Sequence, residues 1–176
     1  MKKLIIILMA VSALFLVSCS KKKVEQPKPT ISENATTQEK VEFYAKNSQN
    51  KDDLQKVEIA GLEKEIAHIK YNQSIWNSED VYLKELCYVY PDVAKDVFNS
   101  CSEIKTIVFW FMLDEKTTIV RCELNRSTFE KISDVASYKA SCTLDYNNFI
   151  DSVDSVYIYP SIKAKLTKLT SKRKTN

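Results

Sequence analysis

Two consecutive segments with the pattern of β-strands lie so close together in this chain that they must form neighbouring strands. Ile104 to Leu113 and Thr117 to Leu124 are rich in β-branched and aromatic residues, and only Asp114-Glu115-Lys116 separates them. A connection this short makes the strands antiparallel, because a parallel pair needs a crossover of a dozen or more residues. The fold of the chain must therefore include a sheet built around this hairpin.

An earlier segment, residues 56–72, is expected to form another hairpin. Apolar residues alternate with polar ones on both sides of Gly61. A long helix over residues 52–70 is the alternative, and it would carry Gly61 in its interior at a cost of ~1 kcal/mol. Before this segment, Thr36 and Glu39 have the spacing of a capping box, which predicts the start of a short helix.

Two further helices are expected between and after the hairpins. Ser78, followed by two acidic residues, is the expected N-cap of the clearest one, in which apolar residues recur three or four positions apart. Pro91 interrupts that pattern, so we expect a kink or the start of a second helix there. Ser127 and Glu130 have capping-box spacing and predict a helix over residues 127–137.

The order hairpin, helix, hairpin, helix predicts an α+β fold. We expect a mostly antiparallel sheet of about four to five strands, with helices packed on one face. Val156 and Ile158 predict a strand near the end of the chain. The expected divisions are a signal peptide over residues 1–18, a disordered tether over 19–38, one domain over 39–166 and a basic flexible tail over 167–176.

The N-terminus has the pattern of an export signal. Lys2 and Lys3 precede an apolar run from Leu4 to Val17, which is shorter than the ~20 residues that a membrane-spanning helix needs. An uncleaved anchor, or a signal peptide with a chance cysteine, is the alternative. The polar run from Ser18 to Lys23 ends the apolar stretch too early for an anchor.

The end of this run, Leu16-Val17-Ser18-Cys19, resembles the lipobox of bacterial lipoproteins. The resemblance implies that the signal is cut before Cys19 and that the Cys19 thiol carries diacylglycerol, so that membrane lipid is the first partner. It also implies a lipid-anchored protein of the cell membrane or outer membrane that faces the periplasm or the exterior. Ser20 stands where Asp would signal retention in the inner membrane, which favours the outer membrane in a host that has one.

A second resemblance covers residues 66–132, which are similar to a small α+β module of other exported bacterial proteins. It is carried by Trp76-Asn77, Pro91 to Phe98, Asn125-Arg126 and Phe129 to Ile132. It implies neither an activity nor site residues.

The balance of basic and acidic residues gives the protein no overall attraction to nucleic acid or to an acidic partner. The chain has 26 basic and 23 acidic residues, so loss of Lys2 and Lys3 with the signal leaves a nearly neutral protein with no pull towards nucleic acid. Gly61 is its only glycine, which excludes glycine-rich loops that hold nucleotide phosphates, and no cofactor is expected. Lys21 to Lys23 either contact anionic head groups or form a solvated flank.

Four cysteines follow Cys19 in the chain, namely Cys87, Cys101, Cys122 and Cys142. An even number in an exported protein is typical of disulfides, and the sequence leaves three pairings open. Four buried free thiols are the alternative. Cys87 and Cys101 would lie ~21 Å apart on a continuous helix and could pair only if Pro91 folds the chain back.

His68 is the only histidine, so a Ser-His-Asp or Cys-His mechanism would have to use it. Its position between Ala67 and Ile69 in an expected strand favours a structural role. For a metal ion the sequence offers carboxylate pairs, Asp92 with Asp96 and Asp151 with Asp154, which helix ends and solvated faces explain more simply. We therefore expect no metal and no catalytic residue.

The strand from Ile107 to Leu113 is apolar on both faces. Val108, Trp110 and Met112 share the face that the helices are not expected to cover, where polar residues would be usual. Either the N-terminal segment and the C-terminal tail cover this face, which we favour, or it is a patch that binds an envelope protein or a membrane. The sequence thus predicts a lipid-anchored cell-envelope protein with a non-catalytic binding or structural domain, and a small envelope hydrolase or thiol enzyme using His68 is the alternative.

Overall fold

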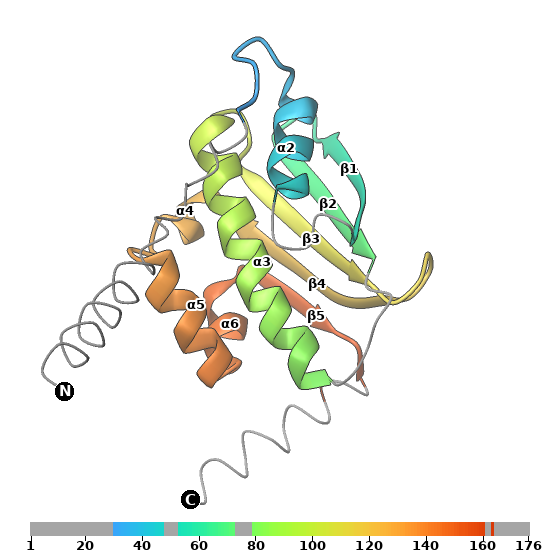
Figure 1. Ribbon diagram of the computed structural model, residues 1–176, viewed down its shortest axis with the longest axis vertical. Helices are drawn as coiled ribbons and strands as arrows, with labels where there is room; N and C mark the ends of the chain where they lie inside the picture. Colours follow the sequence, from blue (N-terminus) through green and yellow to red (C-terminus); the bar gives the residue numbers. More distant parts are fainter. Residues whose placement is uncertain (1–29, 48–52, 73–78, 161–162, 164–176) are drawn as a thin grey trace, which may run out of the picture. The chain divides into compact units, whose positions relative to one another are not determined.

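The computed structural model describes residues 30–47, 53–72, 79–160 and 163 (Figure 1). The chain divides into two compact units, and the second, Ile31–Asn176, contains the described helices and strands. In chain order these are α2 (Thr37–Lys46), β1 (Leu54–Ala60), β2 (Ile66–Asn72), α3 (Glu79–Ser100), β3 (Thr106–Met112), β4 (Thr118–Asn125), α4 (Arg126–Phe129), α5 (Val135–Leu144), α6 (Asn147–Ser152) and β5 (Ser155–Ile158). The export signal, Cys19, the tether before residue 30, Trp76 to Ser78 and the basic tail lie outside the described residues.

The strands form one mixed sheet in the order β1-β2-β3-β4-β5. β1 with β2, β3 with β4, and β4 with β5 are antiparallel, as the hairpin patterns predict. β2 and β3 are parallel, because α3 carries the chain from the end of β2 back to the start of β3. The α+β class is confirmed, with a mixed sheet in which antiparallel pairing predominates among the described strands.

The helix α2 begins with the capping box that the sequence predicts. The Thr36 hydroxyl accepts a hydrogen bond from the Glu39 backbone N–H, and a Glu39 carboxylate oxygen accepts one from the Thr36 N–H at 2.7 Å. The helix thus begins inside residues 19–38, which the sequence pattern assigned to the tether. Its residue Ala45 is buried, and the Ala45 carbonyl accepts a hydrogen bond from the Tyr71 hydroxyl at 3.2 Å, which fixes α2 against the sheet.

The β1–β2 hairpin depends on the conformational freedom of Gly61. Gly61 has a φ of 93°, a region that residues with a side chain rarely adopt. Its carbonyl accepts a hydrogen bond from the Lys64 N–H at 3.3 Å, which closes the turn. The hairpin is confirmed, and the alternative of one long helix over residues 52–70 is wrong.

Helix α3 continues through Pro91 without a second helix starting there, so that part of the expectation is wrong. Proline removes a helical hydrogen bond and crowds the preceding turn, at a cost of ~3 kcal/mol. Burial offsets this cost, because Leu86, Tyr90 and Val97 on both sides of Pro91 are 0% exposed, and each fully buried apolar side chain contributes roughly 1.5–3 kcal/mol.

Arg126 closes the C-terminal end of α3. Its guanidinium donates hydrogen bonds to the backbone carbonyls of Phe98 at 2.6 Å, Cys101 at 2.7 Å and Ile104 at 2.7 and 3.1 Å. Carbonyls at the end of a helix lack partners within the helix and carry the negative end of its dipole. A planar cation with several donors satisfies both needs and ties α3 to the start of α4.

The helix expected over residues 127–137 is wrong, because the chain forms two helices there. Ser127 does not cap α4, whose N-cap is Asn125, and Glu130 lies at the C-cap. Asp134 starts α5 instead, by accepting a hydrogen bond from the Ala136 N–H at 3.0 Å. The Asp134 cap lies inside the expected helix, and an aspartate there competes for backbone donors and breaks the helix.

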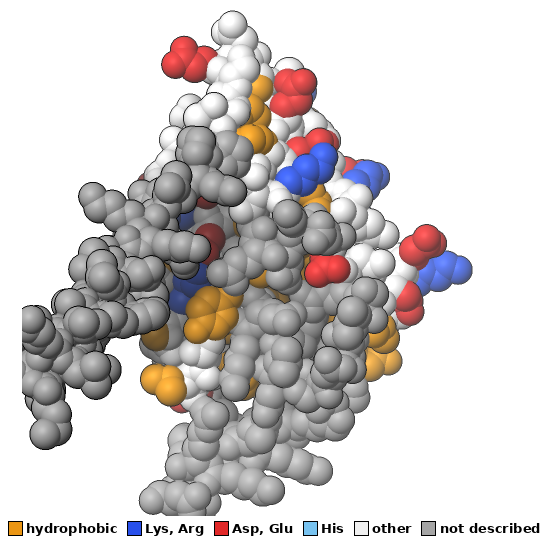
Figure 2. Space-filling model, in the orientation of Figure 1, with side chains coloured by type: hydrophobic (Ala, Val, Ile, Leu, Met, Phe, Trp, Pro, Cys, Tyr) orange, Lys and Arg blue, Asp and Glu red, His pale blue; other side chains and the backbone are white. Residues whose placement is uncertain are grey.

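The helices lie on one face of the sheet, which we call the inner face (Figure 1). Alternate residues of the strands point into this core, and Ile69, Phe109 and Cys122 are 0% exposed. Tyr90 of α3 packs edge-on against Phe109 of β3 and Phe149 of α6, with ring centroids 5.9 and 5.3 Å apart. On the helix side, side chains of both charges lie at the visible margin of the described surface (Figure 2).

Candidate binding surface

The opposite face of the sheet, the outer face, carries a row of aromatic and basic side chains. The register places Lys70 of β2 beside Trp110 of β3, Trp110 beside Arg121 of β4, and Arg121 beside Tyr157 of β5. We call these four residues the Trp110 row. Side chains directly opposite one another on neighbouring strands have Cβ atoms only about 4.5–5.5 Å apart, so the row is a continuous strip across four strands.

Trp110 lies between two cations. The Lys70 ammonium lies 5.7 Å from the centre of the Trp110 ring, and the Arg121 guanidinium 5.1 Å from it. Both distances are within the range of cation–π attraction. The indole Nε1–H donates a hydrogen bond to His68 Nδ1 at 3.3 Å, so the polar edge of this half-buried ring also has a partner.

Two carboxylates hold the cations of the row in place. Glu58 on β1 lies 3.8 Å from the Lys70 ammonium and 2.5 Å from that of Lys56, and Glu123 lies 3.1 Å from the Arg121 guanidinium. Pairs this exposed contribute only ~0–1 kcal/mol each to stability. Their effect here is to orient Lys70 and Arg121 over the indole ring.

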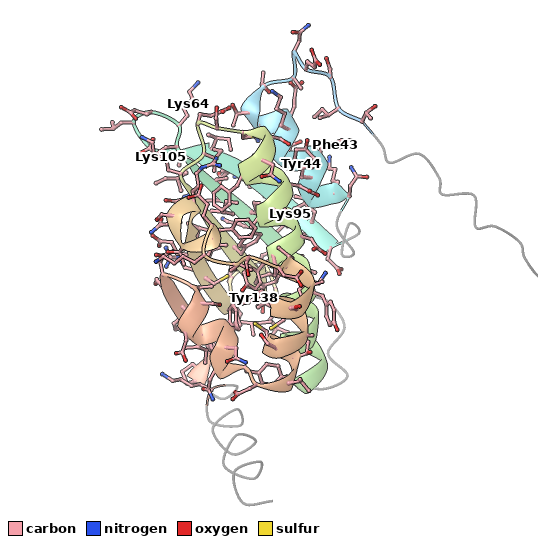
Figure 3. All side chains as sticks on the ribbon, turned by 90° about the vertical axis from the view of Figure 1, so that its left-hand side faces the viewer. Phe43, Tyr44, Lys64, Lys95, Lys105 and Tyr138 are labelled. Atoms are coloured by element: carbon pink, nitrogen blue, oxygen red, sulfur yellow. The ribbon has the colours of Figure 1, made fainter. Side chains whose placement is uncertain are left out.

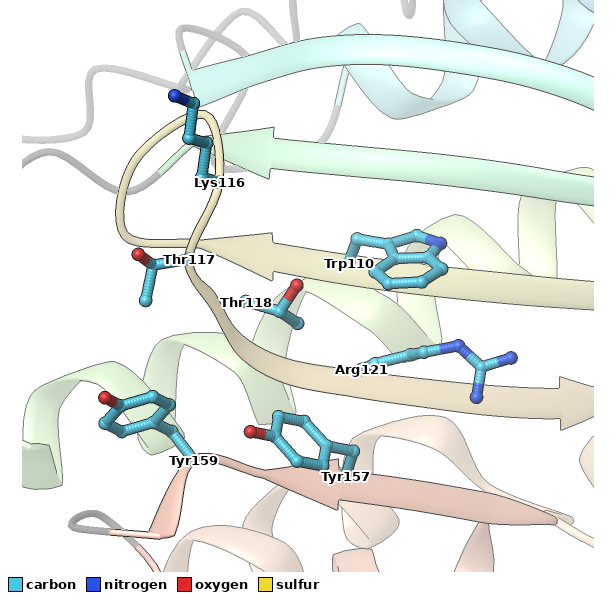
Figure 4. A pocket seen from close by; sticks show the side chains of 7 residues that line it. All are labelled: Trp110, Lys116, Thr117, Thr118, Arg121, Tyr157 and Tyr159. Atoms are coloured by element: carbon cyan, nitrogen blue, oxygen red, sulfur yellow. The ribbon is translucent and has the colours of Figure 1, made fainter.

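A groove of about 640 Å³ opens beside the row, lined by Trp110, Lys116, Thr117, Thr118, Arg121, Tyr157 and Tyr159 (Figure 4). Tyr157 on β5 and Tyr159, the residue after this strand, are 46% and 42% exposed, and β5 pairs with β4. The β3–β4 loop supplies Lys116. The groove therefore combines exposed aromatic rings, hydroxyl groups and two cations.

Asp114 fixes the conformation of the loop that carries Lys116. Its carboxylate accepts hydrogen bonds from the backbone N–H groups of Lys116 at 2.8 Å and Thr117 at 2.7 Å, and from the Thr117 hydroxyl at 3.0 Å. These hydrogen bonds lower the pKa of Asp114. The loop is thus ordered by its own side chain at neutral pH.

The structure separates the three residues of the face that the sequence singled out. Val108 is 2% exposed and Met112 is 7% exposed, whereas Trp110 is half-buried and lines the groove. The accessible surface extends to Tyr157 and Tyr159, whose rings suit either a cover or a binding surface, and to Lys116 of the β3–β4 loop, which the sequence pattern did not indicate. The alternation of Tyr157 and Tyr159 indicates that they share a face of one strand, but only the pairing of β5 with β4 shows that this face is the one that carries Trp110.

The described part of the N-terminal segment does not cover the outer face. Residues 37–46 form α2, which packs against the inner side of the sheet through the contact between Ala45 and Tyr71. What lies over Trp110 among the described residues is Lys70 and Arg121. The rest of the N-terminal segment after the expected signal, residues 19–29, and residues 161–162 and 164–176 of the C-terminal tail, which were expected to cover this face, lie outside the described residues.

His68 lies on the outer face, away from the cysteines. Cys122 is on the inner side of β4, and Cys87, Cys101 and Cys142 are buried in or beside the helical layer. Burial lowers the pKa of His68, and the nearby cations Arg121 and Lys70 lower it further. The carboxylate of Glu58 raises it by less than these effects lower it. Within the described residues, the structure therefore does not bring His68 and a cysteine together.

The cysteines, and the carboxylate pairs that the sequence offered for a metal ion, have structural surroundings. Burial raises the pKa of Cys101 to about 11 and that of Cys122 to about 12, so neither is a thiolate at neutral pH. Asp92 is 2.5 Å from the Lys139 ammonium, and Asp154 lies beyond α6 rather than on a helix with Asp151. No group of three or more potential metal ligands occurs within the described part of the chain.

A second hollow, of about 560 Å³, lies between α4, α5 and α6 and includes Asp134 and Asp151. Asp134 caps α5 through the Ala136 N–H at 3.0 Å and accepts a hydrogen bond from the Ser137 hydroxyl at 2.5 Å. Its carboxylate is therefore used to build the helix. The Trp110 groove is the stronger candidate, because its cations and rings face an open surface.

Comparison with protein-family models, curated proteins and solved structures gives no match. Among the described residues, no helix combines the length and the apolar character needed to cross a membrane. The site must therefore be interpreted from its own chemistry.

Proposed function

We propose that this chain is a lipid-anchored protein of the bacterial cell envelope, and that its domain is a non-catalytic binding module. The N-terminal sequence supports the anchor, since the basic residues, the short apolar run and the lipobox pattern end at Cys19. Acylation of Cys19 would keep the domain beside a membrane, because a flexible tether of some 18 residues spans only ~25 Å on average.

The Trp110 groove carries the binding part of the proposal. Tryptophan, tyrosine and arginine are the residue types that most often dominate the energy of protein–protein interfaces. Trp110, Arg121, Tyr157 and Tyr159 bring all three types together on one open face. The partner that fits them is an envelope protein that presents an apolar side chain beside acidic ones, which would meet Arg121 and Lys116.

The anchor is tested by replacing Cys19 with serine in the full chain. We expect the wild-type protein to incorporate labelled palmitate and to sediment with membranes, and Cys19→Ser to do neither. Cys101→Ser is the matched control, because it removes a cysteine without touching the lipobox. Palmitate incorporation by Cys19→Ser would refute the assignment of the lipid to this residue.

The binding surface is tested by cross-linking in the native envelope. We expect Arg121→Gln and Tyr157→Ala to reduce capture of the partner by at least ~30-fold, which corresponds to the ~2 kcal/mol of a hot-spot residue. Leu144→Ala is the control, because Leu144 is 71% exposed at the end of α5. Equal capture by all variants would refute the proposal, and capture of further copies of this chain alone would make the groove a subunit interface.

A further inference from the structure

The contacts between α3 and α5 define how these two helices lie against each other. The Tyr90 hydroxyl of α3 is hydrogen-bonded to the Tyr138 hydroxyl of α5, and the Lys139 ammonium lies 2.5 Å from Asp92 and 5.1 Å from the centre of the Tyr88 ring. Figure 3 shows Tyr138 within the helical layer. Tyr90 contacts Tyr138, whereas Cys87, earlier in α3, contacts Cys142, later in α5, so the helices are antiparallel (Figure 1).

This register brings two cysteines together. Cys87 lies three residues before Tyr90, and Cys142 lies four residues after Tyr138, so each is one turn further along the same antiparallel contact. Both are 0% exposed, and the Cys142 side chain is the largest cause of the raised pKa of Cys87, which places the two thiols next to each other. The two sulfur atoms thus face each other across the helix interface.

The spacing of packed helices suits a covalent link between them. Helix axes are typically 8–10 Å apart and Cα atoms lie about 2.3 Å from each axis, which leaves about 3.5–5.5 Å between Cα atoms that face each other directly. A disulfide needs a Cα–Cα distance of about 4.4–6.8 Å. Facing cysteines at the α3–α5 contact therefore need little movement of the backbone to join.

We propose that Cys87 and Cys142 form a disulfide that links α3 to α5 when the chain meets a disulfide-containing oxidant. The other pairings fit the structure less well. Cys101 lies 14 residues beyond Cys87 along a continuous helix, or ~21 Å. Cys122 is also near Cys87, but it lies on β4 outside the α3–α5 contact, and its thiol is hydrogen-bonded to the backbone of Phe109 on the neighbouring strand.

Cys142 is the thiol that starts the exchange. Hydrogen bonds from Cys87, Tyr138 and Ser141 lower the pKa of Cys142 despite its burial, whereas the same contact raises the pKa of Cys87. Thiolates are the attacking species in disulfide exchange. Because both thiols are buried in the folded domain, the reaction takes place during local opening of α5. Tyr138 and Ser141 lie on α5 and move with Cys142, so their hydrogen bonds still favour its thiolate when the contact with Cys87 is broken.

The reaction balances without any other reagent. The Cys142 thiolate attacks one sulfur of the oxidant's disulfide, forms a mixed disulfide and releases the first oxidant thiolate. The Cys87 thiolate then attacks the Cys142 sulfur, which forms the protein disulfide and releases the second oxidant thiolate. Two protons and two electrons pass from the cysteine pair to the oxidant, which leaves as two thiols.

Peptide mapping of the full chain tests this pairing. The protein is refolded in an oxidising buffer of glutathione and its disulfide, quenched with acid and alkylated under denaturing conditions. We expect the peptides with Cys87 and Cys142 to be joined, and Cys101 and Cys122 to be alkylated. Alkylation of both Cys87 and Cys142, or a link between either of them and another cysteine, would overturn the proposal.

Thermal unfolding gives a second readout that does not depend on mapping. The disulfide closes a loop of more than 50 residues, and such a link should raise Tm by on the order of 10 °C over the reduced protein. Cys87→Ala and Cys142→Ala should lose the sensitivity of Tm to reductant, and Cys101→Ala should keep it. A Tm of the wild-type protein that reductant leaves unchanged would also overturn the proposal. Neither experiment involves the Trp110 groove or the lipid anchor.

Discussion

Replacement of Arg126 by alanine tests how the end of the longest described helix is held. The Arg126 guanidinium makes four N–H···O contacts, at 2.6 to 3.1 Å, with the carbonyls of Phe98, Cys101 and Ile104. It also lies 4.8 Å from the centre of the Phe98 ring. The substitution removes all of these contacts and leaves the three carbonyls beside a cavity.

The expected cost follows from the number and type of these contacts. A hydrogen bond to a charged group contributes roughly 1.5–3 kcal/mol, and a buried carbonyl left without a donor costs a similar amount. The four contacts share one side chain and three acceptors, and Arg126 is partly exposed, so their contributions do not simply add. We expect Arg126→Ala to lower the free energy of unfolding by about 3 kcal/mol.

Urea unfolding of the full chain, followed by circular dichroism, measures this change. Arg126→Lys is the informative companion, because lysine keeps a positive charge near the helix end but lacks the planar fork of donors, and it should recover only about 1 kcal/mol. Lys95→Ala, a change at an exposed position of α3, should leave the free energy of unfolding within about 0.5 kcal/mol of the wild type. The reasoning is refuted if Arg126→Ala is as stable as Lys95→Ala, or if lysine replaces arginine without loss.

Three further predictions concern local features of the fold. The pKa of His68 is lower in the folded protein than the 6.5 of the unfolded chain, so as the pH falls the unfolded chain takes up a proton on His68 before the folded protein does. The free energy of unfolding should therefore fall as the pH drops below 6.5. His68→Gln should remove this pH dependence. In a Trp76→Phe background, Trp110 fluorescence should report the loss of its hydrogen bond to His68 over the same range. Burial raises the pKa of Asp154, but hydrogen bonds from Asn125 and Thr128 outweigh it and lower the pKa below its usual 3.8. The contribution of Asp154 to the free energy of unfolding is therefore present above pH 3.8 and lost as the pH falls through the lowered pKa. Thermal unfolding at neutral pH should show a loss of about 1 kcal/mol for Asp154→Ala, since this carboxylate caps the start of α4. Gly61→Ala should cost about 1–2 kcal/mol, because alanine is strained at a positive φ, whereas Leu62→Ala at a fully exposed neighbour should change little in the same assay.

The parts of the fold that the sequence predicted are those that local chemistry controls. The two hairpins follow from alternation and short connections, and α2 follows from a reciprocal cap between Thr36 and Glu39. The errors lie where distant groups decide the outcome. Asp154 holds the start of α4 from 29 residues away, since it accepts a hydrogen bond from the Asn125 N–H at 2.6 Å. Burial on both sides of Pro91 keeps α3 continuous.

The candidate site was predictable only in part, for a similar reason. An apolar strand with Trp110 on its outer face indicates that something unusual lies there. The partners of Trp110 come from β2, β4 and β5, and which residues face it depends on register. A shift of one residue would replace Arg121 by a residue of the opposite face. Sequence patterns alone do not fix that register.

The arrangement of charges explains which residues of the groove are left to recognise a partner. Lys70 and Arg121 already contact the Trp110 ring, and Glu58 and Glu123 hold them there. This cluster therefore forms a fixed floor, from which Arg121 lines the groove and meets an acidic side chain of the partner. The exposed side of the groove is formed by Tyr157 on β5, Tyr159 just after β5 and Lys116 on the β3–β4 loop. Changes there should alter which partner is bound, whereas changes at Trp110 should weaken the surface as a whole.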